Sequence, residues 1–191
     1  AHAGEVEIFE DPSAKGGAFA NMYEGTDTSY GKITNGKLHA VIDSGSVITF
    51  YHEDGRVLLK EHFRRLRDEE SMPLNIMGRE YSNGVGDNFR IVARFVARKG
   101  EKIFGMGQYQ QHELDLKGCM LELAQRNSQV SVPFYLSSIG YGFLWNNPGV
   151  GQVMFANNGT EWVTESGKEI DYLVIAGDTP AEIEENYMTL T

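Results

Sequence analysis

The sequence predicts an all-β fold, a β-sandwich with one helix at its C-terminal end. Short runs with apolar residues at every second position recur along most of the 191 residues, a spacing typical of strands that bury one face. Turn signals, such as Asn-Gly and Asp-Gly, separate many of these runs. A helical pattern with a start signal comes only after Asp178, near the end of the chain. At this length one large all-β domain is the favoured arrangement.

Composition and charge narrow the classes of partner. The chain carries 17 basic and 27 acidic residues, a formal net charge of −10, which argues against nucleic acid and anionic membranes. It has no apolar run of membrane-spanning length and no signal-peptide pattern at its start. Because Cys119 is the single cysteine, no intramolecular disulfide can form. We therefore expect a cytoplasmic location; because a leader could have been removed, a secreted or periplasmic one stays open.

The first half of the chain contains two predicted hairpins. Residues 32–42 carry Asn35-Gly36 between apolar positions, and residues 47–51 and 57–59 flank Glu53-Asp-Gly55. An earlier alternating fragment covers residues 6–8. Residues 62–70 form a charge run in which acids balance arginines, so a solvated connection or strand edge is expected rather than a nucleic-acid patch.

Residues 89–98 give the clearest strand pattern. One face would hold two phenylalanines, two alanines and an isoleucine: Phe89, Ile91, Ala93, Phe95 and Ala97. The other face alternates arginine with valine: Arg90, Val92, Arg94, Val96 and Arg98. The three arginines indicate a face that lies in water or against an acidic partner.

A polar loop, Gln125-Arg-Asn-Ser-Gln129, precedes the next predicted hairpin. A strand over residues 130–138 and its return over residues 141–145 meet at Ile139-Gly140. Four residues of the first strand, at every second position, should form one buried face: Val130, Val132, Phe134 and Leu136. A rigid hairpin that holds a polar loop is a common way to build half of a binding site.

The last third of the chain predicts another hairpin, over Asn157-Asn-Gly159, then a strand over residues 170–176, then the helix. Thr179 is the expected N-cap, with Pro180 at the first helical position and Glu182 completing a capping box. The helix carries an apolar stripe: Ile183, Tyr187 and Leu190. We expect a sandwich domain over residues 1–177 and a connecting helix over residues 178–191, with the stripe exposed and able to support self-association.

Several groups of residues in the sequence are candidates for chemistry. Gly105-Met-Gly107 is better explained by a backbone bend than by a nucleotide-binding loop. The segment His112-Glu113-Leu-Asp115 fits no tight metal motif, so no metal and no cofactor are expected. Cys119 is interpreted as a small apolar strand residue. Glycoside hydrolysis needs two facing carboxylates; Glu113, Asp115 or Glu122 could supply one, but the sequence does not pair them.

A set of motifs resembles the N-terminal β-sandwich domain of glycoside hydrolase family 31, which contains α-glucosidases and α-xylosidases. The motifs are Phe104-Gly-Met-Gly-Gln108, Gln125-Arg-Asn-Ser-Gln129, Val132-Pro-Phe-Tyr-Leu-Ser-Ser138, Gly140-Tyr-Gly-Phe-Leu-Trp-Asn-Asn147 and Gly177-Asp-Thr-Pro-Ala-Glu-Ile183. The resemblance is specific from about Phe104 onward, and before that it rests on strand pattern. It implies a galactose-mutarotase-like β-sandwich.

The resemblance also implies where the chemistry lies. In the family, the nucleophile and the acid/base are aspartates of a (β/α)8 barrel that begins after the Gly-Asp-Thr-Pro helix, so no residue here inherits a catalytic role. The implied partners are an α-linked sugar and the chain's own catalytic barrel. The chain by itself is expected to be inactive, and its parent to be a hydrolase.

A loop of the family's sandwich helps to close the substrate pocket and in many α-glucosidases reads Trp-Asn-Thr-Asp. The matching positions are Arg126, Asn127, Ser128 and Gln129. Asn127 keeps its type, whereas Gln129 replaces the acid and would bind a hydroxyl without charge assistance. The resemblance thus implies substrate contacts by Arg126, Asn127 and Gln129, and it leaves α-xylosidase or another α-glycosidase open. The alternatives are a free-standing carbohydrate-binding module and a mutarotase or epimerase, for which no histidine–carboxylate pair can be named.

Overall fold

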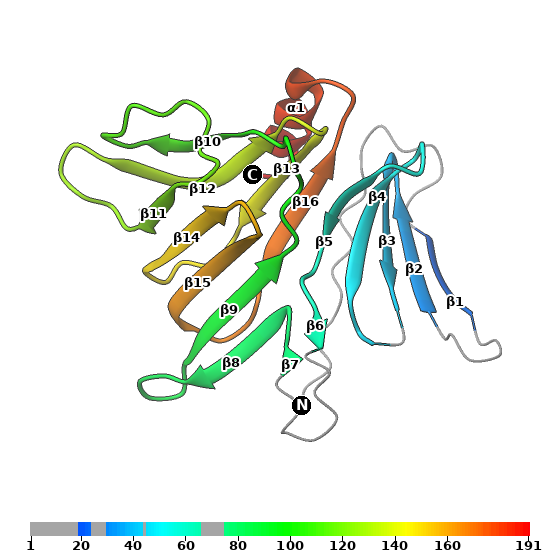
Figure 1. Cartoon of the computed structure of the whole chain (residues 1–191), viewed down its shortest axis with the longest axis horizontal. Helices are drawn as coiled ribbons and strands as arrows, with labels where there is room; N and C mark the ends of the chain where they lie inside the picture. Colours follow the sequence, from blue (N-terminus) through cyan, green and yellow to red (C-terminus); the bar gives the residue numbers. More distant parts are fainter. Residues whose placement is uncertain (1–18, 24–29, 44, 66–74) are drawn as a thin grey trace.

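The structure is a computed structural model of the chain, and it describes residues 19–23, 30–43, 45–65 and 75–191. Its strands form three antiparallel sheets and a two-stranded ribbon, followed by one short helix (Figure 1). The all-β prediction with a C-terminal helix is confirmed. The fragment at residues 6–8 and residues 66–70 of the charge run lie outside the described residues.

Sheet 1 is a meander of the first five strands. They are β1 (Phe19–Tyr23), β2 (Tyr30–Asn35), β3 (Leu38–Ile42), β4 (Ile48–His52) and β5 (Val57–Lys60), paired in that order. Gly36 in the β2–β3 turn and Gly55 in the β4–β5 turn have φ angles of 55° and 85°, a region that glycine enters without steric cost. Both predicted hairpins are therefore confirmed.

Sheets 2 and 3 form the sandwich. Sheet 2 has the order β11 (Met120–Leu123), β14 (Gly151–Ala156), β15 (Gly159–Gly167), β9 (Phe89–Phe95), β8 (Arg79–Asn83). Sheet 3 has the order β10 (Ile103–Gln108), β12 (Val130–Ser137), β13 (Tyr141–Trp145), β16 (Tyr172–Ala176). The ribbon joins β6 (Arg64–Arg65) to β7 (Asn75–Ile76).

Aromatic rings fill the space between sheets 2 and 3. Phe143 lies 5.2 Å from Trp162 between ring centroids, and Tyr135 meets Phe155 edge to face at 5.4 Å, offset and edge contacts that rings prefer. Sheet 1 shares this core, because Phe50 of β4 reaches Tyr172 of β16 at 6.2 Å. One buried apolar cluster thus holds all three sheets together.

Strand β9 shows how the predicted arginine face is satisfied. Arg94 lies between Glu80 of β8 and Glu161 of β15, at 2.8 and 2.7 Å, and Arg90 pairs with Glu165. For Arg90 and Arg94 the acidic partner is therefore the neighbouring strands of the same sheet, whereas the strand ends at Phe95 and the predicted third arginine, Arg98, lies beyond it. Val92, on the arginine face, is nonetheless buried.

The predicted buried face of β12 is only half correct. Phe134 is buried, but Val130 and Val132 are 52% and 36% exposed. The deepest side chain of the strand is Tyr135, on the opposite face, which points into the aromatic core. The reason is that sheet 3 has two apolar faces, one against sheet 2 and one under the helix, and Phe134 belongs to the cluster under the helix.

Helix α1 (Pro180–Leu190) begins as predicted at the Thr179 N-cap, whose hydroxyl accepts a hydrogen bond from the backbone N–H of Glu182. The second half of the capping box differs, because the Glu182 carboxylate accepts from the N–H of Asp178 rather than Thr179.

The expectation that the helical stripe is exposed is wrong. Ile183 is 1% exposed, and Tyr187 stacks on Phe134 with ring centroids 4.0 Å apart. Leu190 packs against the same cluster. Burial of the stripe on sheet 3 removes the basis for self-association through it. In the part of the chain that the structure describes, no helix combines the length and apolarity needed to cross a membrane.

Candidate functional site

The polar loop connects the two layers of the sandwich. It leaves β11 at the edge of sheet 2 and enters β12 of sheet 3, and Figure 1 shows it projecting from the end of the sandwich away from sheet 1. At its tip the backbone N–H of Gln129 donates to the carbonyl of Arg126 at 3.1 Å, closing a tight turn. Ser128 adopts a φ of 68° there, an uncommon conformation for a residue with a side chain. The turn thus has a defined shape.

Gln125 braces the base of this loop. Its amide nitrogen donates to the Ser131 carbonyl at 2.7 Å, and its amide oxygen accepts from the Ser131 N–H at 3.1 Å. The Tyr109 hydroxyl lies 2.7 Å from Ser131 Oγ and 2.9 Å from the carbonyl of Glu122. Burial raises the pKa of Tyr109. The tyrosine therefore joins the ends of β11 and β12 on either side of the loop.

The glycine motif on β10 allows close approach to the same region. The register between β10 and β12 shifts between Gly105 and Gly107, which marks a bulge, and Met106 between them has a φ of 69°. A Cβ on Gly107 would lie 2.2 Å from the Val130 carbonyl oxygen. The predicted backbone bend is confirmed, and it lets β10 lie against the start of β12 beside the loop.

Arg126 is held by a carboxylate. Its guanidinium makes two contacts with Glu122, at 2.6 and 2.5 Å, the bidentate geometry that suits this pair. These hydrogen bonds lower the pKa of Glu122. Arg126 remains 58% exposed, so its side chain stays accessible beside the turn while Glu122 balances its charge.

Asn127 and Gln129 differ from Arg126. Asn127 is exposed and Gln129 half-buried, and among the described residues neither side-chain amide has a hydrogen-bond partner. The three predicted residues therefore lie in one turn, with one partnered cation and two amides that are free to donate and accept.

The predicted residues do not line the cavity nearest to them in the described part of the chain. A cavity of about 330 Å³ lies at the base of the loop, and its walls include Gln125, Ser131, Asn147 and Val150. Arg126, Asn127 and Gln129 are absent from those walls. The turn therefore offers hydrogen-bonding groups on an open surface, and a pocket around them would need a second surface.

Of the other chemical candidates, Asp115 has a structural role. Asp115 Oδ1 accepts from the backbone N–H groups of Ile103 and Lys117 at 3.0 and 3.1 Å, whereas His112 and Glu113 are exposed. Among the residues described, no group of three or more His, Cys, Asp or Glu could hold a metal ion. Burial raises the pKa of the Cys119 thiol, which disfavours the reactive thiolate.

Sequence reasoning missed the residues that support the turn. The sequence places Gln125 in the polar loop, but both ends of its side-chain amide form hydrogen bonds with the backbone of Ser131. Glu122 was considered as a catalytic carboxylate, but it is bound to Arg126. The four-residue spacing of Glu122 and Arg126 is a usual signal for an ion pair on helices only, so the sequence alone could not assign it at the end of a strand.

Comparison with known proteins finds similar sequences among glycosidases. No family model matches the chain. An uncharacterized family 31 glucosidase from Pseudescherichia vulneris is 44% identical over 170 residues, which cover 83% of this chain and 32% of that protein. An α-xylosidase from Saccharolobus solfataricus is 34% identical over 112 residues, covering 54% of this chain and 15% of that enzyme.

Solved structures show the same relation. The crystal structure of a GH31 α-xylosidase from a soil metagenome, complexed with xylose, has a TM-score of 0.79 and 44% sequence identity. The match covers 88% of this chain and 26% of that one. The chain thus spans about a third or less of the length of the relatives it matches.

Proposed function

The chain belongs to glycoside hydrolase family 31 as an N-terminal β-sandwich domain, and we propose that it is a non-catalytic part of a retaining α-glycosidase. In this role it supports a catalytic barrel and contributes the 126–129 turn to the substrate pocket. The observation that carries the proposal is that 83% of the chain aligns at 44% identity with only 32% of a family 31 glucosidase.

The state of the carboxylates supports a non-catalytic role. A retaining glycosidase needs two carboxyl groups about 5 Å apart on either side of the scissile bond. Asp115 accepts two backbone hydrogen bonds, and Glu122 is neutralised by Arg126. The buried Glu101 accepts from Ser137 and Tyr141, at 2.6 and 2.8 Å, inside the core. Each of these three carboxylates already forms hydrogen bonds or an ion pair with other groups of the chain.

The turn supports the second part of the proposal. Sugar hydroxyls both donate and accept hydrogen bonds, and a primary amide does the same. Asn127 and Gln129 carry free amides on a turn that Gln125 holds rigid, and a barrel packed against this end of the sandwich would supply the second surface of a pocket. We infer that the two amides bind hydroxyls of an α-linked sugar, and we favour an α-xyloside because two of the relatives are α-xylosidases.

The test compares this chain with the full-length protein on 4-nitrophenyl α-xyloside and α-glucoside. The 191-residue chain should give no turnover of either substrate above the buffer blank. The full-length protein should hydrolyse the α-xyloside faster than it hydrolyses the α-glucoside. Turnover by the chain alone would contradict the non-catalytic role. Calorimetry with xylose and glucose on the chain alone separates the alternative of a free-standing carbohydrate-binding module, which requires saturable binding without the barrel.

A further inference from the structure

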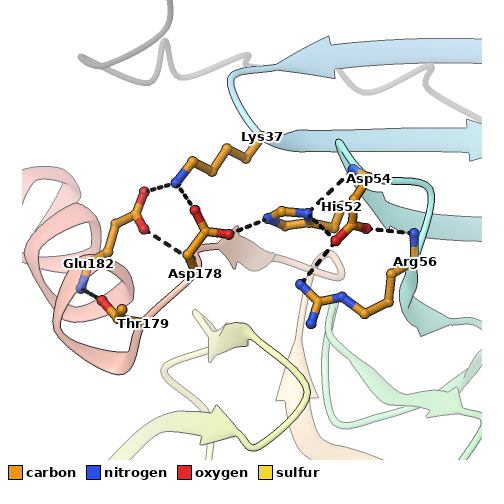
Figure 2. A network of polar contacts seen from close by, with 7 residues as sticks. All are labelled: Lys37, His52, Asp54, Arg56, Asp178, Thr179 and Glu182. Carbon is orange, nitrogen blue, oxygen red and sulfur yellow. Dashed lines mark hydrogen bonds and ion pairs between the residues drawn. The ribbon is translucent and has the colours of Figure 1, made fainter.

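A second polar cluster lies where the chain passes from β16 into α1. Two turns of sheet 1 meet this junction, and Figure 2 shows Lys37 and His52 from these turns pointing toward Asp178. We call these residues the latch: Lys37, His52, Asp54, Arg56, Asp178 and Glu182. Lys37 and Asp178 are 141 positions apart in the sequence, so the latch joins distant parts of the chain.

Lys37, in the β2–β3 turn, binds two carboxylates at once. Its ammonium lies 2.6 Å from Asp178 Oδ2 and 2.5 Å from Glu182 Oε1. Glu182 uses its other oxygen to accept from the N–H of Asp178. The hydrogen bonds from Lys37 lower the pKa of both carboxyl groups. One cation therefore fixes the residue before the N-cap and the first turn of the helix together.

His52, at the end of β4, supplies a second connection. Its side chain is 3% exposed, and its Nδ1 lies 3.1 Å from Asp54 Oδ2 while its Nε2 lies 3.3 Å from Asp178 Oδ1. The Nε2 contact has an ion-pair distance without the alignment of a hydrogen bond. Asp54 is in turn held by the backbone N–H of Arg56 at 2.8 Å, which lowers the pKa of Asp54. The imidazole is thus set between carboxylates from two elements.

The other contacts of α1 are of a different kind. The helix packs on sheet 3 through Ile183 and Tyr187, a non-directional attachment that depends on buried apolar area. The junction itself is tight, because the Gly177 N–H donates to the Gly140 carbonyl and a Cβ on Gly177 would lie 2.7 Å from Ile183. The latch adds a directional attachment from the same helix to sheet 1.

We propose that the latch couples the start of α1 to sheet 1, so that the helix start and the two hairpin turns open together. Opening one side leaves charged partners on the other side without their pairs, which favours opening of both. Because of this coupling, a change that opens the hairpin turns of sheet 1 also raises the opening of the start of α1, and the reverse holds. This inference concerns contacts within the chain and does not depend on the proposed function.

Hydrogen exchange measured by mass spectrometry on the 191-residue chain at neutral pH tests the coupling. Lys37→Met keeps the aliphatic stem and removes the ammonium, and Asp178→Asn keeps the shape and removes the charge. Each should raise exchange about threefold both in residues 36–39 and in residues 179–183, consistent with the modest strength of partly exposed ion pairs. His52→Gln should do the same for residues 53–57 and 179–183.

Two controls make the result decisive. Arg126→Met removes a more exposed ion pair at the other end of the sandwich and should leave both regions unchanged. The double variant of Lys37→Met and Asp178→Asn should exchange less than the two single effects combined would give, because both variants remove the Lys37–Asp178 pair. Faster exchange confined to the substituted side, or additive effects in the double variant, would overturn the proposal.

Discussion

The 126–129 turn and the latch are both polar, both exposed in part, and both built at the ends of strands, yet they differ in how their polar groups are used. In the latch, the Lys37 ammonium is satisfied by two carboxylates of the chain itself. In the turn, Arg126 is paired, but the amides of Asn127 and Gln129 make no hydrogen bond within the described part of the chain. Groups that are satisfied within the chain hold the fold, and groups with spare hydrogen-bonding capacity on a rigid support are candidates for binding a ligand.

The largest expected effect on stability concerns the apolar packing of α1 on sheet 3, to which the latch does not contribute. Ile183→Ala removes the 1% exposed side chain that docks α1 on sheet 3, and it should cost about 3 kcal/mol of unfolding free energy. Urea denaturation gives the value. Met188→Ala is the matched control, because Met188 is 77% exposed on the same helix and should change stability by less than about 0.5 kcal/mol. Similar values for both variants would show that packing does not dock the helix.

The next effect concerns the bulge beside the turn. Gly107→Ala places a Cβ 2.2 Å from the Val130 carbonyl at a φ of 89°, so we expect a loss of about 3 kcal/mol from strain and clash combined. Gly100→Ala has a similar φ of 81° with nothing within 4 Å, and it should cost only the conformational part, about 1 kcal/mol. Equal losses would show that the close approach of β10 and β12 is relieved at no cost.

Within the polar loop, Gln125 and Asn127 should differ in how much each contributes to stability. Gln125→Ala removes two hydrogen bonds to Ser131 and should lower the unfolding free energy by about 1–2 kcal/mol. Asn127→Ala removes no hydrogen bond within the described part of the chain, so stability should change by less than about 0.5 kcal/mol. Chemical denaturation of the two variants side by side decides, and a large loss for Asn127→Ala would mean that its amide serves the fold.

The smallest effect is the pH dependence of the latch. The pKa values of Asp178 and Glu182 are lowered in the folded chain, first of all by the hydrogen bonds from Lys37. Their contribution is therefore present above the ordinary carboxyl pKa of about 4 and is lost as the pH falls through the lowered values.

Melting curves of the wild type and Lys37→Met at neutral pH and near pH 2 provide the test. At neutral pH the melting temperature of the wild type should exceed that of Lys37→Met by at most about 2 °C. Near pH 2 the two melting temperatures should be equal. A difference that persists in acid would mean that Lys37 acts through packing instead of charge.

Local signals in the sequence predicted local structure well. The Asn35-Gly36 turn and the Thr179–Pro180 helix start depend on a few adjacent residues, and the structure confirms both. Features that depend on distant segments could not be predicted in the same way. Val130 and Val132 have the same alternation as Phe134, but α1 covers only the Phe134 end of that face.

The candidate site shows the same division. The sequence placed Arg126, Asn127 and Gln129 in one polar loop, and they do share a turn. It did not predict which of the three would be free, because that depends on Glu122 and on the fold of β11 against β14. The pairing of Lys37 with Asp178 was beyond prediction for the same reason.

The most direct test of the account is the kcat/KM of the full-length protein for 4-nitrophenyl α-xyloside when Asn127 and Gln129 are both changed to Ala. Loss of two neutral hydrogen bonds of about 1 kcal/mol each predicts a fall of about 30-fold, with an unchanged melting temperature. A kcat/KM equal to that of the unmodified protein would contradict the claim that the 126–129 turn contributes to substrate binding.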